Sequence, residues 1–234
     1  TYVASEGTSS KGISASEYLL FSDEDTQEVL NSFTINLNAN RRLDYLNAIS
    51  SNLIVKANEI NTIWTADEIG FTTSLESGIS GSQSQLTNAL ITLIEEVVIS
   101  KLGNGLGDNT GGIIDVEALE AYRSKTSLII IQEHLSALKR CYNGAFIDES
   151  IKWGYDDYLV LIGNETLDKE IVDAFDACQE SIDGFSNSLS EALSTHPESV
   201  IALQNSFTDL LVLFKVDMAN TIGTTVTIND NDGD

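Results

Sequence analysis

Apolar residues recur every three or four positions along most of this 234-residue chain, which is the spacing of one buried face on an α-helix. The pattern predicts long helices over 37–64, 83–102, 116–142 and 167–193, and a last helix from about residue 195. The single proline, Pro197, fits the first turn of that last helix, where its missing N–H is not needed. We therefore expect an all-α fold, with long antiparallel helices in one or two up-and-down bundles.

The residues expected to face the core form one stripe on each helix. In chain order they are Leu43, Leu46, Ile49, Leu53, Ala57, Ile60, Trp64; Leu86, Leu90, Leu93, Ile94, Val97; Leu128, Ile131, Leu135, Leu138, Tyr142; Ile171, Phe175, Cys178, Ile182, Phe185, Leu189; and Val200, Leu203, Phe207, Leu210, Leu211, Phe214, Met218. The polar stretches 65–82 and 103–112 predict loops, and Gly103 fits a C-terminal helix cap. Residues 224–228 alternate like a strand but have no evident partner.

Charge narrows the classes of partner. The chain has 36 acidic and 12 basic residues and a formal charge of −24, so nucleic acid and anionic membrane surfaces are disfavoured as ligands. Two explanations of the acidity stay open, namely solubility and a field that concentrates cations. Hydrophobic residues make up 42% of the chain, which is typical of a globular protein rather than a disordered one.

The cysteines and the ends of the chain say little about compartment. Cys141 and Cys178 are expected to be buried free thiols or, in an exported protein, a disulfide, and without neighbouring histidines they do not form a zinc site. No charged-then-apolar leader is present, and the apolar runs are expected to be too short to span a bilayer. A chain that starts at Thr1 is expected to have been processed or trimmed.

The most informative segment is a glycine turn that leads into a short helix. Residues three apart share a helix face, so Ser14 and Glu17 are expected to point the same way, while apolar residues that follow anchor the helix. The stretch from Gly12 to Glu17, with its Tyr18-Leu19-Leu20-Phe21 continuation, resembles the imelysin-family signature GxHxxE and the aromatic-Leu-Leu run after it. Serine stands at position 14 where the family has histidine, which impairs any chemistry that needs imidazole.

The resemblance extends over nearly the whole chain. Further landmarks are Arg42, Tyr45-Leu46, Trp64, Lys101-Leu102-Gly103-x-x-Leu106-Gly107, Ser124-x-x-Ser127, Tyr142-x-Gly144 and the closing Asp230-Asn231-Asp232-Gly233-Asp234. Family members usually have more helical sequence upstream of the motif. The resemblance therefore implies one imelysin-like helical domain over 1–234, with the N-terminal part of the family domain missing.

A weak similarity between two segments of the chain suggests a second acidic motif. Asp157-Tyr158-Leu159-Val160 follows Gly154 as Glu17-Tyr18-Leu19-Leu20 follows Gly12. Chance and a true repeat are both open explanations. A true repeat predicts two sub-bundles, 1–112 and 113–234, related by a pseudo-twofold axis, with Asp157 as the counterpart of Glu17.

The resemblance implies a bacterial exported protein, periplasmic or on the outer surface, often lipid-anchored in its precursor. It points to Gly12, Ser14 and Glu17 as the binding motif, with Glu17 the candidate ligand for iron or another divalent cation. The competing interpretations are local: Glu17 as a first-turn glutamate favoured by the helix dipole, and Ser14 as a helix cap.

The other sequence motifs have ordinary structural explanations. Glu133-His134 lacks the second histidine of HExxH, so His134 reads as a core or helix-surface residue, and His196 lies in a loop before Pro197. The acidic stretches 23–25 and 230–234 read as a solvated turn and a flexible tail, since the latter fails the calcium-loop pattern.

Three functional classes follow, and the residues identify no catalytic group. First is an exported binding protein for a small cation or another ligand. Second is a peptidase, as the family name implies, although water activation normally needs a metal centre or a positioned acid–base pair. Third is a surface structural or adhesion protein, because helical bundles serve many functions.

Overall fold

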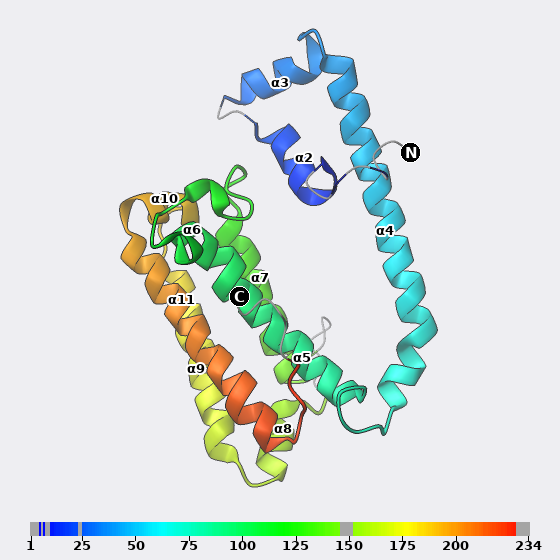
Figure 1. Ribbon diagram of the computed structural model, residues 1–234, viewed down its shortest axis with the longest axis vertical. Coiled ribbons are helices and arrows are strands. Elements are labelled where there is room, and N and C mark those ends of the chain that lie inside the picture. The colour runs from blue at the N-terminus through cyan, green and yellow to red at the C-terminus, as the bar shows by residue number, and fades with distance from the viewer. Residues whose placement is uncertain (1–4, 6, 8–9, 23–24, 146–151, 228–234) are drawn as a thin grey trace. The chain divides into compact units, whose positions relative to one another are not determined.

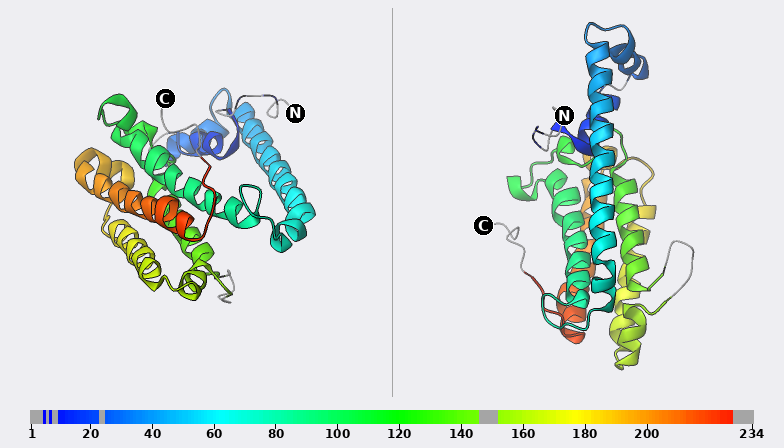
Figure 2. Two further views of the ribbon diagram at one scale, coloured as in Figure 1. Left: turned by 60° about the horizontal axis from the view of Figure 1, so that its bottom comes forward. Right: turned by 90° about the vertical axis from the view of Figure 1, so that its right-hand side faces the viewer.

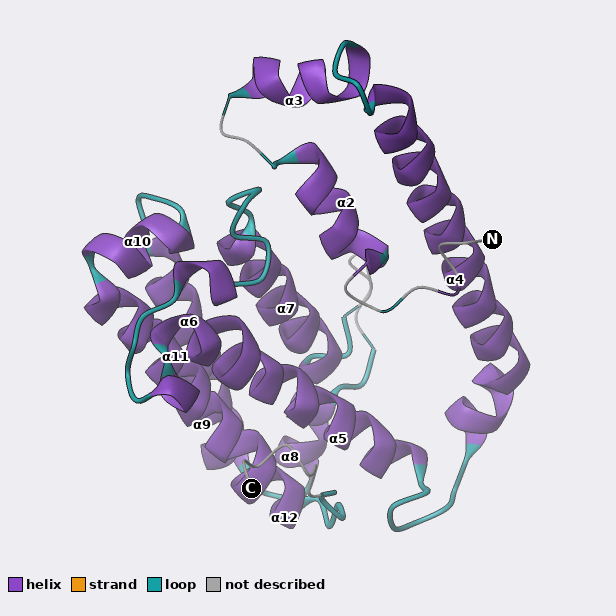
Figure 3. Cartoon of the chain, turned by 45° about the horizontal axis from the view of Figure 1, so that its top comes forward, coloured by secondary structure: helices purple, strands orange, loops and turns teal. Residues whose placement is uncertain are grey.

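The structure is a computed structural model that describes residues 5, 7, 10–22, 25–145 and 152–227. The chain divides into two compact units, Thr1–Thr73 and Ser74–Asp234, here unit 1 and unit 2. Every regular element in the described part of the chain is helical, and no β-strand occurs there (Figure 3). The prediction of an all-α fold is confirmed.

Unit 1 consists of two short helices packed on one long one. Helices α2 (Gly12–Leu20) and α3 (Thr26–Thr34) both contact α4 (Ala39–Thr73), along its N-terminal part (Figure 1). The Asp25 side chain caps α3 by accepting the Gln27 N–H at 2.8 Å. The small core of this unit comprises Ala15, Leu19 and Ile49, with Phe33, Tyr45, Leu46, Ala48 and Leu53 packed against it.

Helix α4 is longer than predicted. Residues 65–73, expected to be loop, continue the helix as far as Thr73. Glycine costs only about 1 kcal/mol in a helix interior, so Gly70 does not break it, and the Thr72 and Thr73 hydroxyls donate to carbonyls one turn back. The expected stripe is buried only in part, because Ile49 is fully buried whereas Ile60 and Trp64 are exposed.

Unit 2 is a helical bundle. Its elements are α5 (Ser82–Glu95), the π-helical η2 (Glu96–Gly103), α6 (Asn104–Leu106), the 3₁₀ turns η3 (Asp108–Thr110) and η4 (Val116–Ala118), α7 (Ser127–Tyr142), α8 (Tyr155–Leu161), α9 (Glu165–Asp183), α10 (Leu189–Thr195), α11 (Pro197–Val212), the π-helical η5 (Leu213–Met218) and α12 (Ala219–Thr221). Helix α11 contacts both α9 and α5, and α7 contacts α9. Figure 2 shows α9, in yellow, running beside α11, in orange.

The core of unit 2 follows the predicted stripes closely. Nearly all of the stripe residues of α5, α7, α9 and α11 belong to one continuous apolar cluster or pack directly against it. Three aromatic rings lie at its centre, with centroid separations of 5.6 Å for Tyr142–Phe175, 5.9 Å for Tyr142–Phe214 and 5.8 Å for Phe175–Phe214. Helices on both sides of residues 112–113 contribute to this single cluster.

Several element boundaries differ from the prediction in unit 2. The helix does not end at Gly103 but continues to Leu106, and Gly107 takes the left-handed conformation at φ +79°. Residues 119–126 are not helical, because Ala121 and Lys125 adopt positive φ. The helix expected over 167–193 is divided between α9 and α10, with Gly184 as the C-cap of α9.

The last helix begins where expected, with one difference at its cap. Pro197 is its first residue, as predicted, and the N-cap is His196, whereas the sequence pattern places the start at about residue 195. The described part of the tail, up to Thr227, forms no strand. Its backbone instead bonds to α5, where Asn88 donates to the Thr225 carbonyl at 2.9 Å and accepts the Thr227 N–H at 2.8 Å.

One helical stretch in the described part of the chain, Pro197–Thr221, is long and apolar enough to cross a membrane by length and composition. The apolar runs of the sequence predict no stretch of that length. One face of the stretch supplies core residues of unit 2, among them Phe207 and Phe214, which are fully buried. A core helix passes the same test, so this stretch is weak support for a membrane span.

The aromatic cluster gives a test of the core. Phe214→Ala should lower the free energy of unfolding by about 3–5 kcal/mol, because the fully buried ring loses its burial and leaves a cavity. Replacement of the exposed Ile201 by alanine, in the same helical stretch Pro197–Thr221, should cost less than about 0.5 kcal/mol. Urea unfolding followed by circular dichroism measures both, and equal effects would contradict this description of the core.

Candidate functional site

The motif segment adopts the conformation that its sequence predicts. Gly12 is the first residue of α2 and has φ +85°, a left-handed conformation that L side chains rarely adopt. The N-cap is Lys11, in an extended conformation and without a side-chain cap hydrogen bond. Ser14 therefore lies inside the first turn of α2, and the prediction that it caps the helix is wrong.

Ser14 and Glu17 lie one turn apart on α2. The Ser14 side chain is exposed and that of Glu17 is half-buried, whereas Ala15 and Leu19, one turn apart on the buried side, face the core. Of the three residues expected to anchor the helix, only Leu19 does so, because Tyr18 and Phe21 are 54% and 47% exposed. Apolar anchoring thus comes from the Ala15–Leu19 face alone.

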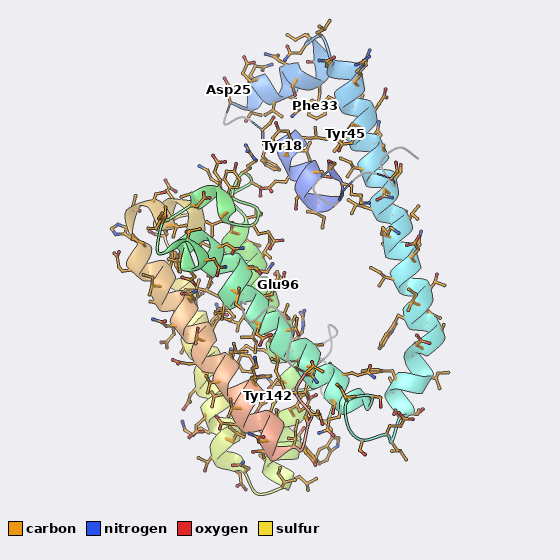
Figure 4. All side chains as sticks on the ribbon, in the orientation of Figure 1. Tyr18, Asp25, Phe33, Tyr45, Glu96 and Tyr142 are labelled. Atoms are coloured by element: carbon orange, nitrogen blue, oxygen red, sulfur yellow. The ribbon has the colours of Figure 1, made fainter. Side chains whose placement is uncertain are left out.

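Two side chains of α4 hold the two ends of α2. At the C-terminal end, Arg42 Nη2 donates to the Leu19 carbonyl at 2.6 Å and to Ser22 Oγ at 2.7 Å, which satisfies a carbonyl that the helix leaves unpaired. Its guanidinium also lies 5.0 Å from the centre of the Phe33 ring. Before the N-terminal end, the Tyr45 hydroxyl donates to the Ser10 carbonyl. Figure 4 labels Phe33 and Tyr45.

Asp157, the predicted counterpart of Glu17, lies in unit 2 and has a local structural role. Its Oδ2 accepts the Gly154 N–H at 3.2 Å at the start of α8, which is the half of a capping box that a glycine N-cap allows. Helix α8 buries Tyr155 and Leu159, four residues apart, as α2 buries Ala15 and Leu19. Gly12, Ser14 and Glu17 are thus brought together within α2, while Asp157 belongs to a separate unit.

A buried polar group lies close to Asp157. Asp156 Oδ1 is buried without a hydrogen-bond partner among the described residues, and burial, together with the nearby Asp157 and Asp168 carboxylates, raises the pKa of Asp156. The Tyr142 hydroxyl donates to Asp168 Oδ1 at 2.7 Å, and burial and this hydrogen bond raise the pKa of Tyr142 far above its usual range. This end of α8 and α9 therefore disfavours additional negative charge.

A charged cluster that the sequence analysis did not identify surrounds Lys101. Only 5% of Lys101 is exposed, and its ammonium pairs with Glu96 at 3.3 Å and with Glu120, both about half-exposed. His134 Nδ1 is buried nearby without a partner in the described part of the chain. Burial, and then the Lys101 charge, lowers the pKa of His134. The sequence signal was a lysine between Ile99 and Leu102, inside an otherwise apolar run.

Comparison with known protein families supports the family resemblance that the motif indicates. Residues 2–214 match the family model described as Imelysin, a peptidase family. The chain belongs to the imelysin family. No curated protein and no solved structure matches it.

The family match spans residues 2–214 and so includes Gly12, Ser14 and Glu17. Within the described ranges, no group of three or more His, Cys, Asp or Glu side chains is arranged to hold a metal ion. His196 is exposed and lies 3.3 Å from Glu198. Asp23, Glu24 and the acidic tail 230–234 lie outside the described residues.

The two cysteines of this imelysin are free thiols. Cys178 is fully buried, and burial raises its pKa to about 12, so its thiol is inert at neutral pH. Cys141, expected to be buried, is exposed near the end of α7. The default expectation of unpaired cysteines holds, but not the expectation that both are buried.

The charged cluster predicts a pH dependence of stability. The pKa of His134 is lower in the folded protein than its ordinary value of 6.5. As the pH falls below about 6.5, the unfolded chain therefore takes up a proton at this residue before the folded chain does. The unfolded state then binds more protons, and stability is lost as the pH drops. His134→Gln should lose less stability than the wild type between pH 7.5 and 5.5 in urea unfolding.

His196→Gln is the matched control for that measurement, because it replaces the exposed histidine. It should retain the wild-type pH dependence. An identical loss of stability in the wild type and His134→Gln would show that the His134 imidazole is not held neutral by burial and Lys101.

Proposed function

We propose that this imelysin is an exported binding protein for a small cation, iron or another divalent ion, with the Glu17 carboxylate as a ligand. Members of the imelysin family are generally bacterial and exported, which supports a periplasmic or outer-surface location. The observation that carries the proposal is the placement of Glu17 on a short helix whose two ends are both fixed by α4.

A fixed, half-buried carboxylate is a better ligand than a mobile one. Attraction between opposite charges grows as the local dielectric falls, so Glu17 attracts a cation more strongly than a fully solvated glutamate would. Carboxylate oxygens are ligands for hard cations and need no imidazole beside them. The formal charge of −24 raises the local concentration of cations around the whole molecule.

Peptidase activity is the second candidate, because the matched family is described as a peptidase family. Activation of water by a metal needs ligands that hold the ion and leave one position open. Ser14 removes the imidazole of the motif, and the described residues contain no prearranged group of three ligands. Binding without hydrolysis is therefore the function that these residues support best.

Glu17→Gln tests the ligand role, because it removes the charge while retaining the size of the side chain. In the wild type, a cation at about 100 times its Kd should add about 2.7 kcal/mol to the free energy of unfolding, and this increment should shrink in the variant. Thermal unfolding with and without Ca²⁺, Mn²⁺ or anaerobic Fe²⁺ measures it. Glu68→Gln, at an exposed position of α4, is the charge-matched control.

Ser14→His extends the same experiment. Histidine at this exposed position restores the imidazole of the family signature one turn from Glu17, so it should increase the stabilisation by Mn²⁺ or Fe²⁺ more than that by Ca²⁺. If no cation stabilises the wild type, or if Glu17→Gln leaves the stabilisation intact, the motif serves only the structure of α2.

A further inference from the structure

A cavity of about 300 Å³ lies within unit 2, between the end of α9, the short α10 and the start of α11. This volume is at the lower end of the range for small-molecule sites, so it suits a compact ligand. Its apolar part includes Phe185, which is partly buried and packs against the main core, and Ala202 of α11. The cavity is far in sequence from Gly12, Ser14 and Glu17 and uses none of them.

The polar lining contains no lysine or arginine, and besides the side chains of Asn187 and His196 its polar groups are hydroxyls and one carboxylate. It includes the hydroxyls of Ser181, Thr195 and Ser199 and the carboxylate of Glu180. The Thr195 hydroxyl donates its proton to the Glu191 carbonyl at 2.8 Å, so only its lone pairs remain for a ligand. The Ser181 hydroxyl shares a hydrogen bond of 2.9 Å with Ser206. A ligand that donates hydrogen bonds fits this lining.

The helix ends around the cavity favour positive charge. Helix α9 is 19 residues long and ends at Asp183, and its last turn has no basic residue to offset the negative end of the helix dipole. Helix α10 also ends at the cavity without a basic residue in its last turn. The N-terminus of α11 is the positive end of its helix dipole and opposes this effect, but it carries the acidic Glu198 in its first turn.

We propose that this cavity binds a small organic cation with a primary ammonium group. The ammonium has three donors for the Glu180 carboxylate and the hydroxyl oxygens, and the Phe185 ring offers a face for a cation–π contact. The one basic side chain that an anionic ligand would find in this lining is His196, whose Nδ1 lies 3.3 Å from the Glu198 carboxylate.

Titration of the 234-residue chain with putrescine, a diamine, tests the site by isothermal calorimetry in 50 mM salt. One saturable site per chain is expected. Glu180→Gln should weaken binding about fivefold, the effect of losing roughly 1 kcal/mol from a partly exposed ion pair. Glu191→Gln, which removes the same charge outside the lining, should bind like the wild type.

A second pair of variants tests the cavity independently of charge. Ala202→Trp fills the cavity and should abolish binding, whereas Ile201→Trp adds the same ring at an exposed neighbouring position and should not. Far-UV circular dichroism checks that all variants fold. Glu17→Gln should not change putrescine binding, which separates this proposal from the function proposed for the motif.

Three results would overturn the proposal. Equal weakening by Glu180→Gln and Glu191→Gln would mean that the diamine is only a counterion of a highly acidic protein. Unchanged binding to Ala202→Trp would place the ligand elsewhere. Binding of glycerol, a neutral polyol, as tight as that of putrescine would mean that the hydroxyl groups rather than the charge select the ligand.

Discussion

The placement of the motif depends on the burial of one small helix face against α4. Helix α2 has nine residues, too few to be stable in water by itself. Ala15 and Leu19 pack against Ile49, and the Arg42 guanidinium and Tyr45 hydroxyl tie the backbone at or beside the two ends of the helix. Because these contacts fix the helix, they also fix where Ser14 and Glu17 lie.

Unit 2 is stabilised by a larger apolar core than unit 1, and it also contains a buried charged side chain. Its apolar cluster spans α5 to α11 around three packed aromatic rings. Lys101 is almost fully buried beside this cluster, and a buried ammonium is strongly destabilising unless it is paired. Glu96 and Glu120 provide that pairing from the protein surface, and burial and the Lys101 charge lower the pKa of His134 beside them. Glu96 and Lys101 both lie in the π-helical element η2, so the change from α-helix to π-helix occurs at this charged cluster.

Periodicity predicted the helices of unit 2 and their buried faces because a core helix in contact with several neighbours has to be apolar along one stripe. The same method failed where a boundary depends on local backbone energy or tertiary contact. Residues 65–73 look like loop because they are polar and contain Gly70, yet nothing in them stops a helix. The positive φ of Ala121 and Lys125 is imposed by the surrounding fold and leaves no trace in residue type. The sequence indicated the motif but not the roles of Arg42 and Lys101, which depend on partners 19 to 23 residues away.

The two proposed sites share one long-range field and differ in local chemistry. A charge of −24 attracts every cation toward the whole surface, but salt screens this attraction beyond about 10 Å. Selectivity therefore has to come from the groups that touch the ligand. Glu17 presents a carboxylate beside the small Ser14 side chain, an arrangement suited to a hard metal ion. The cavity of unit 2 combines one carboxylate with hydroxyls and an aromatic ring, which a dehydrated metal ion cannot use fully but an organic ammonium can. On these two proposals, the acidity of the chain concentrates cations, and each site would select among them by its own ligands.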